Sequence, residues 1–193
     1  ITSIKPYIFP KEIESGGKII LYTGTFGYAN NVQYIVDLAV ALREFDFKFV
    51  LVGEGKYKNK TIANAEKFSV LNHNLFIYGA VNKSEIYSMI KRTDFMISTV
   101  IDHPVMWANS ANKFFDSLTF LKPIIINHKG WLADLIIENN IGFVLDPLVS
   151  PNDADKIAMM LNRTTYGMSA GLLKLSSAEF SFQSIYKKYD AIL

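Results

Sequence analysis

The chain has 193 residues, of which 50% are hydrophobic and 20% charged, and it carries a net charge of +2 without any cysteine. This length and composition favour one globular domain and exclude a disordered chain, a collagen and a coiled-coil rod. The small net charge gives no bulk support for nucleic acid as a partner, and no apolar run approaches the roughly 18 residues of a membrane span. The lack of cysteine excludes disulfides and thiolate metal sites, and it fits a reducing compartment.

The first 17 residues differ in composition from the rest. They hold two prolines and end in Ser-Gly-Gly, and they lack the basic-then-apolar pattern of a signal peptide. We therefore predict that residues 1–17 are a linker from a missing N-terminal domain. Residues 18–193 are then the folded domain, closed by a C-terminal helix.

Six apolar, β-branched runs recur along the chain, and none alternates cleanly between polar and apolar residues. They are Lys18–Gly24, Lys48–Gly53, Leu75–Gly79, Phe95–Val100, Pro123–Asn127 and Gly142–Asp146. Strands that are buried on both faces have this pattern, as in a parallel sheet covered by helices.

The segments between these runs have helical periodicity. The predicted helices are Val32–Phe45, Thr61–Leu71, Lys83–Lys91, Ser110–Leu121, Trp131–Asn139, Asn152–Leu161, Met168–Leu175 and Phe182–Leu193. Asn82 and Ser150 are suitable N-cap residues for two of them. Strands that alternate with helices predict an α/β fold, a three-layer doubly wound parallel sheet of about six strands. Ligands of such folds bind at the carboxyl ends of the strands, near the point where the strand order reverses.

Glycine turns follow the first three predicted strands. Gly24-Thr25-Phe26-Gly27 precedes a helix, where backbone N–H groups can approach a phosphate, although a plain tight turn has the same pattern. Gly53-Glu54-Gly55 can line the same crevice, and the backbone of Gly79-Ala80-Val81 can contact a flat base. The glycine spacing is not GxGxxG, and Glu54 lies too far from Gly24 for the ribose acid of an NAD site.

The segment 108–116 (ANSANKFFD) is small and polar and then opens a predicted helix. Lys113 and Asp116 share one face of this helix, so a cation and a carboxylate stand at a strand end beside a glycine turn. Such a pair suits a nucleotide diphosphate, with the ammonium on phosphate and the acid on sugar hydroxyls. A surface ion pair is the simpler interpretation of the same spacing.

Other catalytic centres find little support in the sequence. The histidines do not have metal-site spacing and no HExxH motif occurs, so we predict no metal. These histidines are His73, His103 and His128, of which His103 can line the crevice after the fourth strand. The sequence also has no GxSxG motif of an α/β-hydrolase and no P-loop motif of an NTPase. The lysines at 56, 58 and 60 form a basic cluster that a solvated surface explains most simply, with attraction of phosphate or an anionic membrane as the alternative.

The ordered set of motifs resembles the C-terminal, donor-binding half of a GT-B-fold glycosyltransferase of the retaining family 4, the glycosyl transferases group 1. Ile20–Gly27 resembles its opening strand and glycine loop, and Phe49–Gly55 resembles its "LVGxG". Tyr78–Val81 resembles its "GxV". The segments 109–116 and 121–123 together resemble its "SxxNKxFDxLxxGKPV", and 130–135 with 140–144 resemble "GGxxELI…NxGxVV". The "NKxFD" form is most like bacterial enzymes of capsule and other cell-surface polysaccharide assembly.

The resemblance implies a transferase that moves a hexose from a nucleotide-diphosphate sugar, UDP-linked, to a polysaccharide or lipid-linked acceptor with retention and without a metal or other cofactor. It assigns Lys113 and Asp116 as the catalytic pair. It also assigns donor binding to Gly24, Phe26, Gly27, Gly53, Glu54, Gly79, Val81, Ser110, Ala111 and Asn112. The partner would be the N-terminal GT-B domain of the full-length protein. The expected location is cytoplasmic, with peripheral association at the inner membrane, and the fragment alone is expected to transfer no sugar.

Three positions depart from the family pattern. Ala108 replaces the first acid of the usual Glu-x7-Glu, and Thr25 and Asn30 replace the cations that neutralise diphosphate near the glycine loop. Two alternatives therefore remain open, a nucleotide- or NAD-binding module of another Rossmann enzyme and a non-catalytic regulatory domain built on a glycosyltransferase half.

Overall fold

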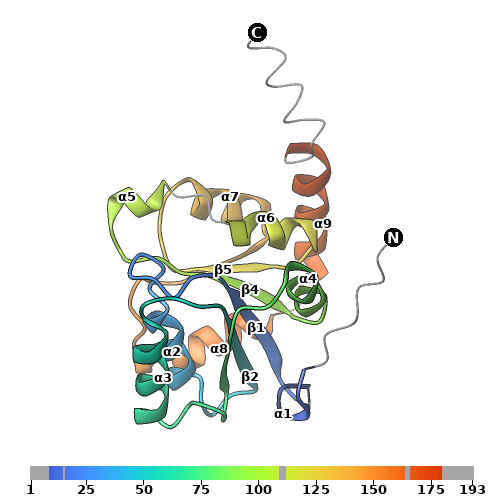
Figure 1. The fold of residues 1–193 in the computed structure, drawn as a ribbon. Coiled ribbons are helices and arrows are strands. Elements are labelled where there is room, and N and C mark those ends of the chain that lie inside the picture. The colour runs from blue at the N-terminus through green and yellow to red at the C-terminus, as the bar shows by residue number, and fades with distance from the viewer. Residues whose placement is uncertain (1–8, 15, 109–111, 164–165, 180–193) are drawn as a thin grey trace.

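A twisted parallel sheet forms the centre of the computed structural model, which describes residues 9–14, 16–108, 112–163 and 166–179. Its six strands are ordered β3-β2-β1-β4-β5-β6 (Figure 1). They are β1 Lys18–Thr23, β2 Phe47–Val52, β3 Leu75–Tyr78, β4 Phe95–Ser98, β5 Ile124–Ile126 and β6 Gly142–Val144. All neighbouring pairs are parallel, so the predicted α/β doubly wound sheet is confirmed.

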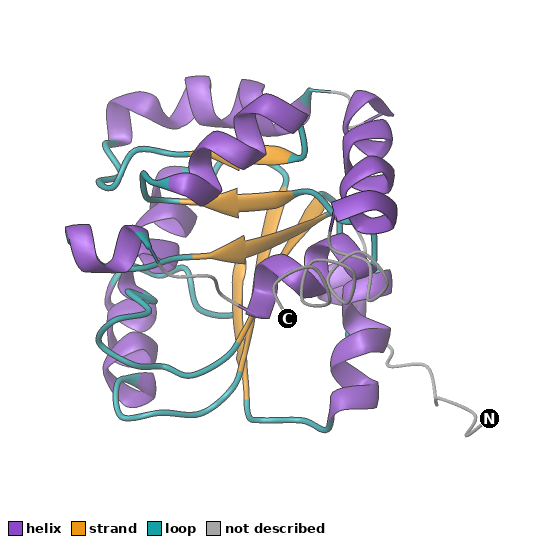
Figure 2. Cartoon of the chain, turned by 90° about the horizontal axis from the view of Figure 1, so that it is seen from above, coloured by secondary structure: helices purple, strands orange, loops and turns teal. Residues whose placement is uncertain are grey.

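Helices cover both faces of the sheet (Figures 1 and 2). One face carries α2 Gln33–Ala41, α3 Lys58–Lys67 and α8 Ala154–Asn162, and the other carries α4 Lys83–Lys91, α6 Asn112–Thr119, α7 Trp131–Asn139 and α9 Tyr166–Lys174. Shorter turns are α1 Lys11–Glu14, α5 Pro104–Trp107, η1 Pro151–Asp153 and the π-turn η2 Leu175–Glu179. The predicted helix Phe182–Leu193 lies outside the described residues.

The strands are apolar because both faces of the sheet are buried. Ile20 and Leu21 on β1 point to opposite faces, and both are fully buried. Phe49 and Val50, their register partners on β2, are fully buried as well. This two-sided burial explains why the sequence showed continuous apolar runs instead of alternation.

The observed elements are close to the predicted ones, with local differences. The strands end one or two residues earlier than predicted, since Gly24 and Gly53 leave the sheet with positive φ. The short helix α5 was not predicted. Within the segment predicted as a linker, Phe9 and Ile13 pack into the core, so this part contributes to the domain. The N-terminal domain to which it would lead stays a prediction.

The predicted N-caps are present. The Asn82 side chain accepts from the Glu85 N–H at 3.0 Å while the Glu85 carboxylate accepts from the Asn82 N–H at 3.1 Å, which makes a capping box. The Ser150 hydroxyl accepts from the Asn152 N–H at the start of η1. The capping box fixes where α4 begins, directly after the turn at 79–81.

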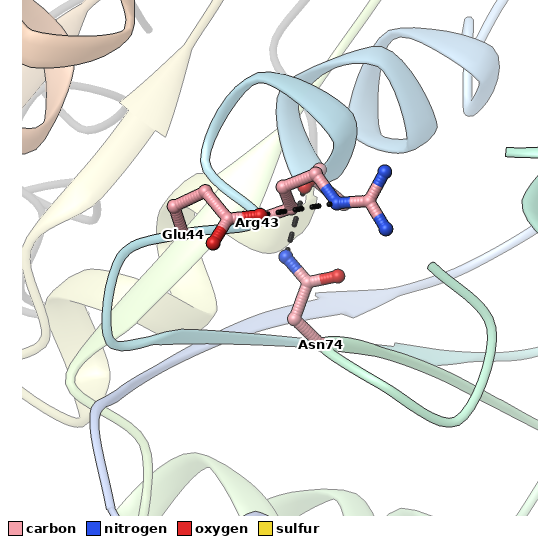
Figure 3. A network of polar contacts seen from close by, with 4 residues as sticks. Arg43, Glu44 and Asn74 are labelled. Carbon is pink, nitrogen blue, oxygen red and sulfur yellow. Dashed lines mark hydrogen bonds and ion pairs between the residues drawn. The ribbon is translucent and has the colours of Figure 1, made fainter. Parts of the chain in front are cut away.

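A buried asparagine joins the start of β3 to α2. The Asn74 amide donates to the Ala39 carbonyl at 2.8 Å, beneath the exposed Arg43–Glu44 pair (Figure 3). The Asn74 side-chain oxygen is buried and has no hydrogen-bond partner among the described residues. The hydrogen bond donated by the amide therefore offsets part of the free-energy cost of burying this polar side chain.

Replacing Asn74 by Asp tests this contact with a change of nearly equal volume. The carboxylate has no donor for the Ala39 carbonyl and places a charge in a buried site, so we expect a loss of about 2–4 kcal/mol in the free energy of unfolding at neutral pH. Asn72→Asp, an exposed control, should change it by less than about 0.5 kcal/mol. Urea unfolding measures both, and equal losses would contradict the role given to Asn74.

Candidate active site

The side chain of a lysine lies at the point where the strand order reverses. The reversal lies between β1 and β4, the central neighbours in the sheet. Lys113, in the first turn of α6, reaches the glycine that follows β1. A Cβ at Gly24 would lie 3.2 Å from the Lys113 Nζ, and the same Nζ lies 4.7 Å from the centre of the Tyr22 ring. The structure thus brings the predicted Lys113 and Gly24 together at the place where doubly wound folds bind ligands.

Tyr22 forms the floor beneath this ammonium. Its ring is fully buried and packs edge-on against Phe26, with centroids 6.0 Å apart. Its hydroxyl donates to the Thr25 carbonyl at 2.8 Å, which fixes the ring orientation. The π face that meets Lys113 is therefore held in place before any ligand arrives.

Burial makes Lys113 an unusual cation. It lowers the pKa of the ammonium from 10.5 to about 8, while Asp116 opposes this shift. Lys113 has no ion pair with any described residue, so the simple surface pair with Asp116 is not what forms. A half-buried ammonium that has no ion pair with a described residue is suited to an anionic ligand.

Asp116 lies one helical turn beyond Lys113 and is half-buried. Burial raises the pKa of this carboxyl, and the charges of Lys83 and Lys113 lower it in part. Lys83 is exposed at the start of α4, with its Nζ 5.4 Å from the centre of the Tyr87 ring. Tyr87 and, more weakly, Asp116 raise the pKa of Lys83. The carboxylate of Asp116 thus lies in the field of two lysines from two helices.

The glycine turns allow the strand ends to touch. A Cβ at Gly53 would lie 1.9 Å from the Gly24 carbonyl oxygen, and one at Gly55 would lie 2.5 Å from the Phe26 carbonyl oxygen. Both residues also have positive φ, at 152° and 153°. Any side chain at these positions would force apart the loops after β1 and β2.

Glu54 contacts the neighbouring strand end. Its carboxylate accepts from the Lys58 Nζ at 2.6 Å, and this contact chiefly lowers the pKa of Glu54, with a weaker contribution from the Ala80 N–H. A Cβ at Gly79 would lie 3.2 Å from the Glu54 Oε1. Glu54 therefore ties the loop after β2 to the predicted base-binding turn at 79–81.

Two residues predicted to bind the donor use their polar groups within the loop itself. The Phe26 N–H donates to the Glu54 carbonyl at 2.9 Å, and its ring is buried. The Gly27 N–H donates to the Thr25 carbonyl at 2.9 Å, so it contacts a phosphate only if this bond breaks. The Asn30 side-chain amide also donates to Thr25, at 2.7 Å. In this conformation Phe26 supports the loop, and Gly27 offers no ready N–H to a diphosphate.

The other predicted residues are less closely tied to Lys113. Asn112 is exposed at the first position of α6, and Val81 is half-buried against the core. Ser110 and Ala111 lie outside the described residues. His103 caps α5 through its Nδ1, which accepts from the Val105 N–H at 3.3 Å, and it is exposed.

Sequence reasoning missed Tyr22 and Lys83, and it placed Lys58 in a basic cluster without its pairing to Glu54. Tyr22 sits in a run of apolar strand residues, where only its hydroxyl set it apart. Lys83 directly follows the capping Asn82, and this position at a helix start was a usable signal. Within the described part of the chain no cluster of His, Asp and Glu could hold a metal ion, and the helices are all too short or too polar to cross a membrane.

The fold and the site together define the class of this protein. A six-stranded parallel sheet of this order, with a cation and a carboxylate after the fourth strand, is the Rossmann-like half of a GT-B fold. The sequence profile of the family "Glycosyl transferases group 1" matches residues 3–165. The chain belongs to this family.

Individual relatives agree with this assignment. An uncharacterised glycosyltransferase of Methanocaldococcus jannaschii is 25% identical over 170 residues, which are 84% of this chain and 44% of the relative. The fold resembles Anabaena HepE, solved with UDP and glucose (TM-score 0.74, 15% identity, 96% of this chain and 52% of that one). It also resembles the C-terminal domain of LpcC from Francisella tularensis (TM-score 0.64, 14% identity, 86% and 90%). The chain thus spans less than half of the archaeal relative and most of the LpcC domain.

The burial of Lys113 predicts a specific pH dependence of stability. Between pH 8 and 10.5 the folded state binds fewer protons at this group than the unfolded state, so its contribution to stability rises with pH in that window. Lys113→Met removes the titrating group. We expect the free energy of unfolding to rise less over this window in Lys113→Met than in the unaltered chain. Urea unfolding at a series of pH values measures this, and parallel pH profiles would contradict the burial of the ammonium.

Proposed function

We propose that this chain binds the donor of a retaining glycosyltransferase, a nucleotide-diphosphate sugar with UDP as the nucleotide. The observation that carries the proposal is the half-buried Lys113 ammonium at the β1–β4 reversal, which has no ion pair with any described residue. Family membership and the similarity to HepE, solved with UDP and glucose, support the choice of ligand.

Lys113 takes the diphosphate in this proposal. As the glycosidic bond breaks, negative charge builds on the leaving diphosphate oxygen. An ammonium that is half-buried and held over Tyr22 stabilises that charge more strongly than one in bulk solvent. The interaction is stronger in the transition state than in the ground state, and it therefore lowers the barrier. The remaining N–H donors are proposed to come from residues 110–112 and from Gly27, whose N–H becomes available when its bond to the Thr25 carbonyl breaks.

Asp116 holds the ribose hydroxyls, as an ionised carboxylate can accept two hydrogen bonds at once. Lys83 lowers its pKa and so favours the accepting form. The base lies against the turn at 79–81, where Val81 offers an apolar edge. Because the Ala80 N–H already interacts with Glu54, contacts to the base come from the other backbone groups of that turn.

The reaction and location of the full-length protein are proposed from the same family membership. Transfer proceeds with retention and without a metal cofactor, from a hexose donor to a cell-surface polysaccharide or lipid-linked acceptor in bacterial assembly such as that of capsule. An N-terminal GT-B domain supplies the acceptor site, so the 193 residues alone transfer no sugar. The protein is cytoplasmic and associates peripherally with the inner membrane through that domain.

Calorimetric titration with UDP at pH 7 tests the donor site. We expect Lys113→Gln and Asp116→Asn each to weaken UDP binding by about tenfold or more, since each loses a charged partner of the ligand. Lys129→Gln and Asp134→Asn make the same changes at exposed positions and should leave the affinity unchanged.

Titrations with GDP, ADP and NADH complete the experiment by identifying the base and testing the NAD alternative. Binding of UDP with equal affinity by Lys113→Gln and the unaltered chain would contradict the role of Lys113. Preference for NADH over UDP would favour a dehydrogenase-type module instead.

A further inference from the structure

A cavity lies at the same edge of the sheet as Lys113, but on the face covered by α2 and α3. It has a volume of about 250 Å³. Tyr28 and Tyr57 from the loops after β1 and β2 line it, together with Gln33 of α2 and with Lys60 and Asn64 of α3. It adjoins the proposed donor site only through Gly27. None of the residues assigned above to diphosphate, ribose or base except this glycine contributes to it.

The loop that carries Tyr28 is held on both sides. Its Ala29 carbonyl accepts from the Ile101 N–H at 3.0 Å, and its Asn30 carbonyl accepts from the Thr99 hydroxyl at 2.6 Å. On the opposite side, the Phe26 carbonyl accepts from the Tyr57 N–H at 2.9 Å. These bonds fix the backbone from which the two tyrosines extend, which reduces the entropy that the loops lose on binding.

The shape of the cavity suits one sugar ring. The two tyrosine rings are 6.2 Å apart between centroids and tilted by 43°, so they do not form a slot for a planar base. The volume lies below the roughly 300–1,000 Å³ of pockets for drug-sized ligands, which points to a single ring. Aromatic faces cover the C–H face of a pyranose, and the side-chain amides of Gln33 and Asn64 are suited to its hydroxyls.

The charge on the cavity lining is positive. Lys60 is its single charged lining residue among those described, and exposed Lys56 directly precedes Tyr57. Lys58, by contrast, is paired with Glu54 at 2.6 Å and contributes little net charge. The Asn64 amide is oriented by its hydrogen bond to Gln33, whose own amide donates to Asp37. An anionic substituent on the sugar would meet the ammonium of Lys60 at the cavity wall.

We propose that this cavity binds a pyranose that carries a phosphate or carboxylate group, as a subsite for an anionic sugar unit of the acceptor. The assignment of this sugar to the acceptor rests on the proposed transferase function, whereas the proposal that the cavity binds such a sugar does not. The proposal also gives a function to Lys60, one of the three lysines that sequence analysis had assigned to a solvated surface or to attraction of phosphate or an anionic membrane.

NMR titration of the ¹⁵N-labelled chain tests the site with glucose 6-phosphate, glucuronate, glucose and inorganic phosphate. We expect one or both anionic sugars to shift the side-chain amide signals of Gln33 and Asn64, and to bind more tightly than glucose or phosphate alone. Tyr28→Ala and Lys60→Gln should weaken this binding by about tenfold. Tyr28 is 67% exposed, so its removal leaves the fold intact.

Lys67→Gln is the matched control. It lies on the same helix, seven residues and about 10 Å further along the axis, and should bind as the unaltered chain does. Binding of glucose 6-phosphate alone assigns a phosphosugar, and binding of glucuronate alone a uronic acid. No shift with either sugar, equal binding of free phosphate, or unchanged affinity in Tyr28→Ala would overturn the proposal.

A parallel titration with UDP separates this proposal from the donor site. Retained UDP binding without sugar binding in the cavity removes only the second site. Sugar binding in the cavity without UDP binding removes the donor proposal and leaves an anionic-sugar site with another role.

Discussion

The partial burial of one ammonium, with no ion pair to any described residue, is the constraint around which the site is built. Lys113 lies over the face of Tyr22, close to Gly24, and burial lowers its pKa to about 8. Removing an ammonium from water costs free energy that a π face only partly offsets. A bound anion would offset this cost by its attraction to the ammonium. The same burial that lowers the stability of the free protein therefore favours binding of a phosphate. The proposed donor site therefore accounts for a position of Lys113 that burial alone would disfavour.

The strand ends and the loops that follow them position the groups around Lys113. Adjacent parallel strands bring their carboxyl ends to one edge, and the reversal between β1 and β4 lies at that edge, where doubly wound folds bind ligands. Gly24 and Gly53 let the first two loops touch, and the Thr25 carbonyl receives the hydroxyl that orients Tyr22. Glu54 then links the second loop to the third. The same loops hold Tyr28 and Tyr57 on the opposite face, so one set of backbone contacts positions both proposed binding sites.

Much of this was predictable from the sequence, because two-sided burial leaves continuous apolar runs and glycines mark the strand ends. Gly24 was identified in this way, Lys113 from the small polar segment that opens a helix, and the start of α4 from its capping Asn82. The partners of Lys113 were not, since Tyr22 and Lys113 are far apart in the chain and meet only after the sheet forms. The bonded state of the Gly27 N–H and the pairing of Tyr28 with Tyr57 likewise depend on the backbone of loops, which local patterns leave undetermined. The short helix α5 escaped prediction although His103-Pro104 is a suitable start, because four residues show no periodicity.

The most direct test follows the titration of the Lys113 ammonium itself by NMR of the lysine side chain, with and without saturating UDP. In the free chain we predict a midpoint near pH 8. A bound diphosphate favours the charged form, so UDP should move the midpoint upward and UDP should bind more weakly as the pH rises past it. A midpoint that stays the same when UDP is bound would contradict the assignment of Lys113 to the diphosphate.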